Sequence, residues 1–137
     1  MTTSTRPNFE IVLLSEVIDG IGNEQMIAAS RLLARHDEGF WLRRFLDDPR
    51  DSHDGVVEIP NSDNCQTYHG GPVRHLDWMR IGERLRMGTF EASSSEEAIL
   101  AVAASLVGHH EINLRRILSM LDGDQVDLVT RAIAEAG

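Results

Sequence analysis

The sequence has no lysine, one cysteine and few aromatic residues, and each scarcity narrows the class of protein. All 13 basic residues are arginine, which is typical of a GC-rich genome, so we expect a bacterial or phage protein. Cys65 has no second cysteine with which to form an internal disulfide, as is usual in a reducing compartment. Because aromatic residues make up only 5% of the chain, we expect the large ones to anchor the core. These are Phe40, Trp41, Phe45 and Trp78.

Long apolar runs are also missing. No stretch approaches the roughly 20 residues that a transmembrane helix requires. Residues 1–7 lack the basic-then-apolar order of a secretory signal. We therefore expect a cytoplasmic protein without a membrane partner, in which residues 1–7 form a disordered tail.

Acidic residues outnumber basic ones by 22 to 13, which gives a formal net charge of −9. Such a charge opposes the approach of nucleic acids and anionic membranes, because their phosphates are repelled at long range. The acidic residues are concentrated toward the two ends of the chain, around a slightly basic middle at 61–90. These properties favour a protein partner, and in particular a basic one, while the oligomeric state stays open.

The composition is that of a folded domain. With 137 residues, 42% of them hydrophobic and 26% charged, the chain is long enough to bury a core of its own. Residues 8–137 are predicted to form one all-α domain, a compact bundle of five to six helices. The polar residues at 49–72 interrupt it as a long central loop, with one short strand near 56–59.

Helix boundaries in the first half follow from capping residues and apolar spacing. Residues 8–20 are either a helix or a strand, because the apolar run at 9–14 is too short for periodicity to decide. Asn23 is a predicted N-cap for a helix over 24–36, which a break at 37–39 separates from the apolar cluster at 40–46.

The second half shows three further helical segments. Residues 73–88 have helical spacing and end at Gly88. Ser94 and Glu97 form a predicted capping box for the next helix, which either continues through Gly108 or divides there into two. The preceding helix is predicted to end at residues 122–124, and the last helix begins there.

Residues 98–120 resemble a helix-turn-helix in spacing. Ala104 would allow close packing, Gly108 would lie in the turn, and Leu114 and Ile117 would anchor the second helix. The candidate DNA contacts are His110, Asn113, Arg115 and Arg116. Against this hypothesis, residues 94–137 contain 3 arginines and 7 acidic residues, whereas duplex binding depends on phosphate neutralisation.

A zinc site is the second candidate, because thiolate and imidazole groups are preferred zinc ligands. The candidate ligands are His53, Cys65, His69 and His75. Their spacing matches no standard zinc motif, and solvated histidines with a buried cysteine explain the pattern equally well. The same region, 53–75, would be the centre of a metal- or cysteine-dependent enzyme, in which Cys65 and His69 would form a thiolate pair.

The middle segment carries four arginines that could bind a carboxylate or phosphate. They are Arg74, Arg80, Arg84 and Arg86. Acidic residues at i,i+3 spacing favour ion pairs along a solvated face instead. With no strong catalytic or cofactor motif, the leading hypothesis is a small non-catalytic accessory protein that acts by protein–protein binding, and DNA binding and catalysis are the alternatives.

Overall fold

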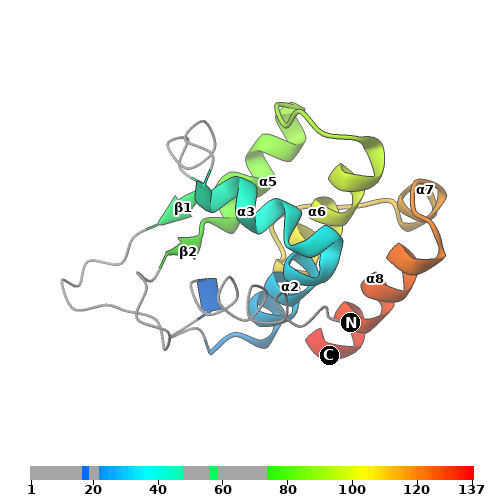
Figure 1. Cartoon of the computed structure of the whole chain (residues 1–137), viewed down its shortest axis with the longest axis horizontal. Coiled ribbons are helices and arrows are strands. Elements are labelled where there is room, and N and C mark those ends of the chain that lie inside the picture. The colour runs from blue at the N-terminus through cyan, green and yellow to red at the C-terminus, as the bar shows by residue number, and fades with distance from the viewer. Residues whose placement is uncertain (1–16, 19–21, 48–55, 59–73) are drawn as a thin grey trace, which may run out of the picture.

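The computed structural model describes residues 17–18, 22–47, 56–58 and 74–137, and in this part of the chain the fold is helical, as predicted (Figure 1). The six α-helices there are α2 (Glu24–Arg35), α3 (Phe40–Asp47), α5 (Trp78–Met87), α6 (Ser94–Val107), α7 (Leu114–Ser119) and α8 (Gly123–Ala136). A 3-10 turn, η1 (His36–Glu38), links α2 to α3. Strands β1 (Val57–Glu58) and β2 (His75–Leu76) pair antiparallel, which confirms the short strand predicted near 56–59.

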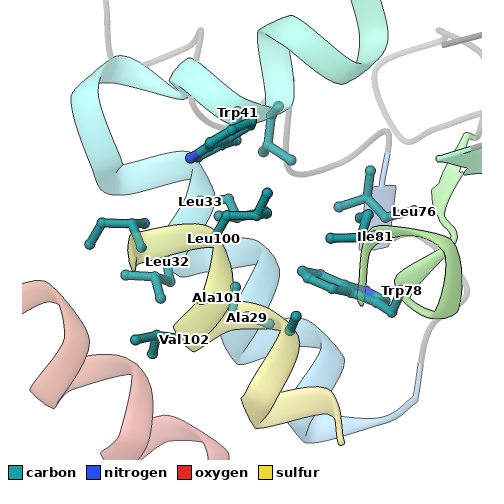
Figure 2. Close-up of a cluster of buried hydrophobic side chains, with 14 of the residues drawn as sticks. Ala29, Leu32, Leu33, Trp41, Leu76, Trp78, Ile81, Leu100, Ala101 and Val102 are labelled. Carbon is teal, nitrogen blue, oxygen red and sulfur yellow. The ribbon is translucent and has the colours of Figure 1, made fainter. Parts of the chain in front are cut away.

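Helix α2 is the centre of the bundle, and α6 and α8 make its most extensive contacts (Figure 1). Helix α6 is buried on every side over seven consecutive residues, Ala98 to Ala104, so it is a central helix and not an amphipathic surface one. Figure 2 shows Leu100 of α6 near Leu33 of α2, and Ala101 of α6 near Ala29 of α2. The small alanines of both helices allow the backbones to approach closely.

Trp41 and its aromatic neighbours close one end of this core. The side chain of Trp41 is fully buried, and its ring centroid lies 5.5 Å from that of Phe45 and 5.3 Å from that of Phe90. The indole Nε1–H donates a 2.8 Å hydrogen bond to the carbonyl oxygen of Glu96. The core role predicted for the aromatic residues is confirmed for Trp41, Phe45 and Trp78, while Phe40 is half-buried against the same cluster.

Most of the helices begin at a residue whose side chain caps the helix, and two helices begin at a residue other than the predicted one. Asn23 caps α2, as predicted, and Asp122, within the predicted break at 122–124, caps α8. The capping box of α6 uses Ser93 and Glu96, one residue earlier than predicted; Ser93–Glu96 and Ser94–Glu97 both have the spacing of a capping box. Residues 75–76 belong to β2, so α5 begins at Trp78 and not at residue 73.

The predicted helix break after α2 takes an unusual backbone form. Asp37, Glu38 and Gly39 all have positive φ values, 46°, 57° and 80°. Residues other than glycine rarely adopt this left-handed conformation, although aspartate tolerates it better than most. The turn holds Asp37 next to the buried side chain of His36 at the surface described below.

Helices α2 and α8 are also joined by an ion pair at their C-terminal ends. Arg35 Nη1 lies 2.9 Å from Glu135 Oε1, and both side chains are largely covered. The hydrogen bond from Arg35 lowers the pKa of Glu135 below its ordinary value. The contact therefore helps to hold α8 against the central helix.

Candidate functional site

Two pockets flank the first turn of α6. The first has a volume of about 430 Å³ and is lined by six apolar and six polar or charged residues, among them Ser94 and Glu97; it is called the apolar pocket here after its six apolar side chains. The second, here called the acidic pocket, has a volume of about 390 Å³ and includes Ser95 and Glu96. Adjacent residues of one helical turn thus face different cavities, so a single bound partner could reach both.

The apolar pocket depends on a close approach between α5 and the segment that follows α6. At Gly82 a Cβ atom would lie 2.1 Å from the carbonyl oxygen of His109, so only glycine fits there. The same oxygen accepts a 3.0 Å hydrogen bond from Arg86 Nη1. The segment 109–113 then forms one wall, and the apolar side chains of the pocket are Leu85, Ala98, Ala101, Ile112, Ile117 and Met120.

Helix α7 borders the apolar pocket and presents apolar side chains to solvent. Asn113 caps the helix by accepting a hydrogen bond from the backbone N–H of Arg116 at 3.1 Å. Ile117 is buried, whereas Leu114 and Leu118 are 53% and 42% exposed. Residues four apart lie on the same side of a helix, so the two leucines form one exposed apolar strip.

The acidic pocket is built from η1 and the first turns of α6 and α8. Its four acidic side chains are Asp37, Glu96, Asp122 and Asp124. His36 also lines it; this side chain is 4% exposed, and its Nδ1 atom has no hydrogen-bond partner. Loss of hydration lowers the pKa of His36, an effect that Asp37, Glu96 and Asp122 partly oppose.

Burial of His36 leads to a prediction about stability and pH. Its folded-state pKa lies below the unfolded value of about 6.5, so the unfolded chain binds more protons in that range and stability falls as pH drops below about 6.5. His36→Gln is expected to remove up to about 1.4 kcal/mol of this fall per pH unit. Urea unfolding between pH 7.5 and 5.5, buffered in small steps, measures it.

His110 is expected to cause part of the pH dependence of stability that remains in the His36→Gln protein. Desolvation also lowers the pKa of His110, with a further contribution from the positive charge of Arg86. His110→Gln should therefore reduce the slope as well, and the double variant should reduce it most. Identical pH profiles for the wild type and all three variants would contradict the assignment.

The residues predicted to bind DNA are brought near one another, but the surrounding geometry departs from a helix-turn-helix. Gly108 does end α6, yet the connection to α7 runs over 108–113, longer than the usual three- to four-residue turn. Leu114, the predicted anchor of the second helix, is exposed. His110, Asn113 and Arg116 line the apolar pocket, and Arg115 is exposed. DNA binding through these residues stays a prediction.

The predicted metal and enzyme sites fall mainly on residues that are not described. His53, Cys65 and His69 lie outside the described ranges, as do the tail at 1–7 and nearly all of the loop at 49–72. His75 lies in β2 and is half-buried. Within the described ranges, no group of three or more His, Cys, Asp or Glu residues is placed to hold a metal ion.

The arginines of the middle segment do not all lie on a solvated face. Arg80 pairs with Glu83, as predicted. Arg84, in contrast, is buried: its guanidinium carbon lies 4.1 Å from the ring centroid of Phe90, and its Nε donates to Thr89 Oγ1 at 3.1 Å. Arg84 is amphipathic enough for its stem and planar guanidinium to pack in the core, which spacing alone did not indicate.

The sequence did not predict the acidic pocket, whereas three of the four residues proposed to contact DNA line the apolar pocket. Asp122 lies in the predicted break before the last helix and Glu96 within the predicted start of α6, but the two are 26 positions apart, and their convergence with His36 depends on how α2, α6 and α8 pack. None of the helices in the described part of the chain is long and apolar enough to span a membrane. Comparison of the chain with protein-family models, curated proteins and solved structures finds no significant match.

Proposed function

We propose that this chain is a small non-catalytic bacterial or phage accessory protein that binds a protein partner through α7 and the two pockets beside the first turn of α6. The observation that carries the proposal is the strip of Leu114 and Leu118, exposed beside the apolar pocket. Exposed apolar side chains next to a concave surface are typical of protein-binding sites. The partner segment would cover the strip and place an apolar residue in the apolar pocket.

Charge favours a basic partner over a second copy of the same chain. Two copies with a net charge of −9 each would repel one another at long range. The acidic pocket lies on the other side of the same α6 turn, so a partner segment with both apolar and basic residues complements the surface. We place this association in the cytoplasm.

The test uses two double variants that are matched in chemistry. Leu114→Gln with Leu118→Gln removes the strip, and Met79→Gln with Met87→Gln removes two apolar side chains of α5 that are 66% and 60% exposed. Glutamine is a good helix former, and circular dichroism checks that both proteins fold. Immobilised wild-type protein first captures the partner from the lysate of its native cell, and the purified partner is then titrated against each variant.

The leucine variant is expected to weaken binding about 30-fold, since each leucine would contribute about 1 kcal/mol. The methionine variant should bind as the wild type does. Increasing salt should weaken the complex, because the partner is basic. Equal losses in both variants, or selective enrichment of duplex DNA in place of protein, would count against the proposal, and the second result would favour DNA binding through residues 98–120.

A further inference from the structure

The acidic pocket combines negative charge from three structural elements. Asp37 comes from η1, Glu96 from α6, and Asp122 and Asp124 from the start of α8. No arginine is among its lining residues within the described chain. Four acidic side chains around one cavity would repel an anion and attract a cation.

The carboxylates of Glu96 and Asp122, which take part in the capping boxes of α6 and α8, can accept further hydrogen bonds in this pocket. Glu96 Oε1 accepts from the backbone N–H of Ser93 at 2.9 Å, and Asp122 Oδ1 accepts from that of Gln125 at 2.8 Å. Each capping bond uses one carboxylate oxygen. A carboxylate has about four acceptor positions on its two oxygens, so both groups can accept further bonds from a donor in the cavity.

His36 is the second and independent indication of a ligand. Its side chain is 96% covered by protein, because its exposed fraction is 4%, and yet its Nδ1 atom has no hydrogen-bond partner. Buried polar atoms are usually satisfied. Since desolvation keeps the pKa of this imidazole low, the ring is neutral at pH 7 and one of its nitrogens accepts a hydrogen bond without repelling a cation.

We propose that the acidic pocket binds the guanidinium group of an arginine side chain presented by the protein partner. The inference deepens the proposed function and rests on it for the source of the arginine. A guanidinium offers five N–H donors in a fixed plane and is only weakly hydrated, so it can bond to several carboxylates and to the imidazole of His36 at once.

Other cations fit these acceptors less well. An ammonium group has three donors that are not held in one plane and is more strongly hydrated, so it loses more water on binding and matches fewer of these acceptors. Among the residues that the structure describes, no group of three or more His, Cys, Asp or Glu is placed to hold a metal ion, as a zinc site built from protein ligands requires. The acceptors instead line a cavity of about 390 Å³, a volume in which a planar side-chain terminus is accommodated readily.

The test uses small probes on the full-length, isotope-labelled protein, followed by nuclear magnetic resonance. The probes are N-acetyl-arginine amide, N-acetyl-lysine amide with a free side-chain amine, and N-acetyl-citrulline amide, which matches arginine in shape but is uncharged. The expected result is that the arginine probe shifts the imidazole signals of His36 and the backbone amides of Glu96 and Gln125. The lysine probe should bind more weakly, and the citrulline probe should leave these signals unchanged.

Two matched variants distinguish the effect of a carboxylate that lines the pocket from the effect of the protein's net charge. Asp124→Asn removes a carboxylate that lines the pocket, whereas Asp127→Asn removes one from the same helix that does not line it. Both side chains are exposed, so neither change should unfold the protein. At near-physiological salt, Asp124→Asn is expected to weaken arginine binding by about two- to five-fold, and Asp127→Asn by clearly less.

Three outcomes would overturn the inference: equal shifts with arginine and citrulline, equal losses in the two aspartate variants, or no shift at His36 at any arginine concentration. These outcomes leave the proposed function standing if the leucine variant still loses its partner. If the leucine variant keeps its partner while the pocket binds arginine, the docking surface of the proposed function fails and the guanidinium site remains. The two ideas are therefore tested separately.

Discussion

Replacement of Trp41 by alanine is expected to lower the free energy of unfolding by about 3–5 kcal/mol. The ring is fully buried between α3 and α6, where it contacts Phe45 and Phe90. Its loss would leave a cavity that neighbouring aromatic rings cannot fill without leaving their own contacts. A domain of this size is stable by about 5–15 kcal/mol, so urea unfolding should show a large shift of the midpoint or a partly unfolded protein.

Trp41→Phe separates packing from hydrogen bonding at this position. Phenylalanine keeps most of the ring but cannot donate to the carbonyl oxygen of Glu96, and we expect a loss of about 1 kcal/mol for the missing bond plus the smaller ring volume. Because the carbonyl group of Glu96 is part of the same peptide unit as the N–H of Glu97, the backbone amide of Glu97 should also change its chemical shift. An alanine variant as stable as the phenylalanine variant would contradict the packing role.

Gly82→Ala is expected to destabilise the protein by about 1–3 kcal/mol, although helix propensity alone predicts a gain of about 1 kcal/mol for alanine. The sign reverses because the new Cβ would lie 2.1 Å from the carbonyl oxygen of His109. That oxygen belongs to the backbone, so relief requires movement of α5 or of the whole segment 109–113. The hydrogen bond from Arg86 to the same oxygen would be stretched as well.

Gly123→Ala is the matched control for this substitution. Gly123 begins α8, and nothing lies within 4 Å of the position of its Cβ, so alanine there should be neutral or stabilise by up to about 1 kcal/mol. Thermal and urea unfolding of both variants provide the comparison. If Gly82→Ala proved as stable as Gly123→Ala, the close approach that forms the apolar pocket would be disproved.

Gly82→Ala also has an expected effect on binding. Movement of segment 109–113 would deform the apolar pocket and the start of α7, so partner capture should fall in any fraction that remains folded. The acidic pocket receives no residue from α5 or from this segment, so arginine binding there should persist. The two pockets thus respond differently to one backbone change.

Helix boundaries were largely predictable because their causes are local. Asn23 and Asp122 accept hydrogen bonds from backbone N–H groups three residues away, and Gly88 and Gly108 end helices in the left-handed conformation. The one-residue error at the start of α6 arose because Ser93–Glu96 and Ser94–Glu97 both have the spacing of a capping box, so the local pattern does not distinguish the two registers.

The sequence by itself determined the helical class, the main caps and breaks, the aromatic core and the excess of negative charge, because spacing and composition act over a few residues. Tertiary structure alone decided that Gly82 meets His109, that Arg84 packs on Phe90, and that His36 faces acidic side chains from two distant helices. These contacts depend on the relative placement of α2, α5, α6 and α8. That placement is fixed by packing over the whole core, which no local pattern specifies.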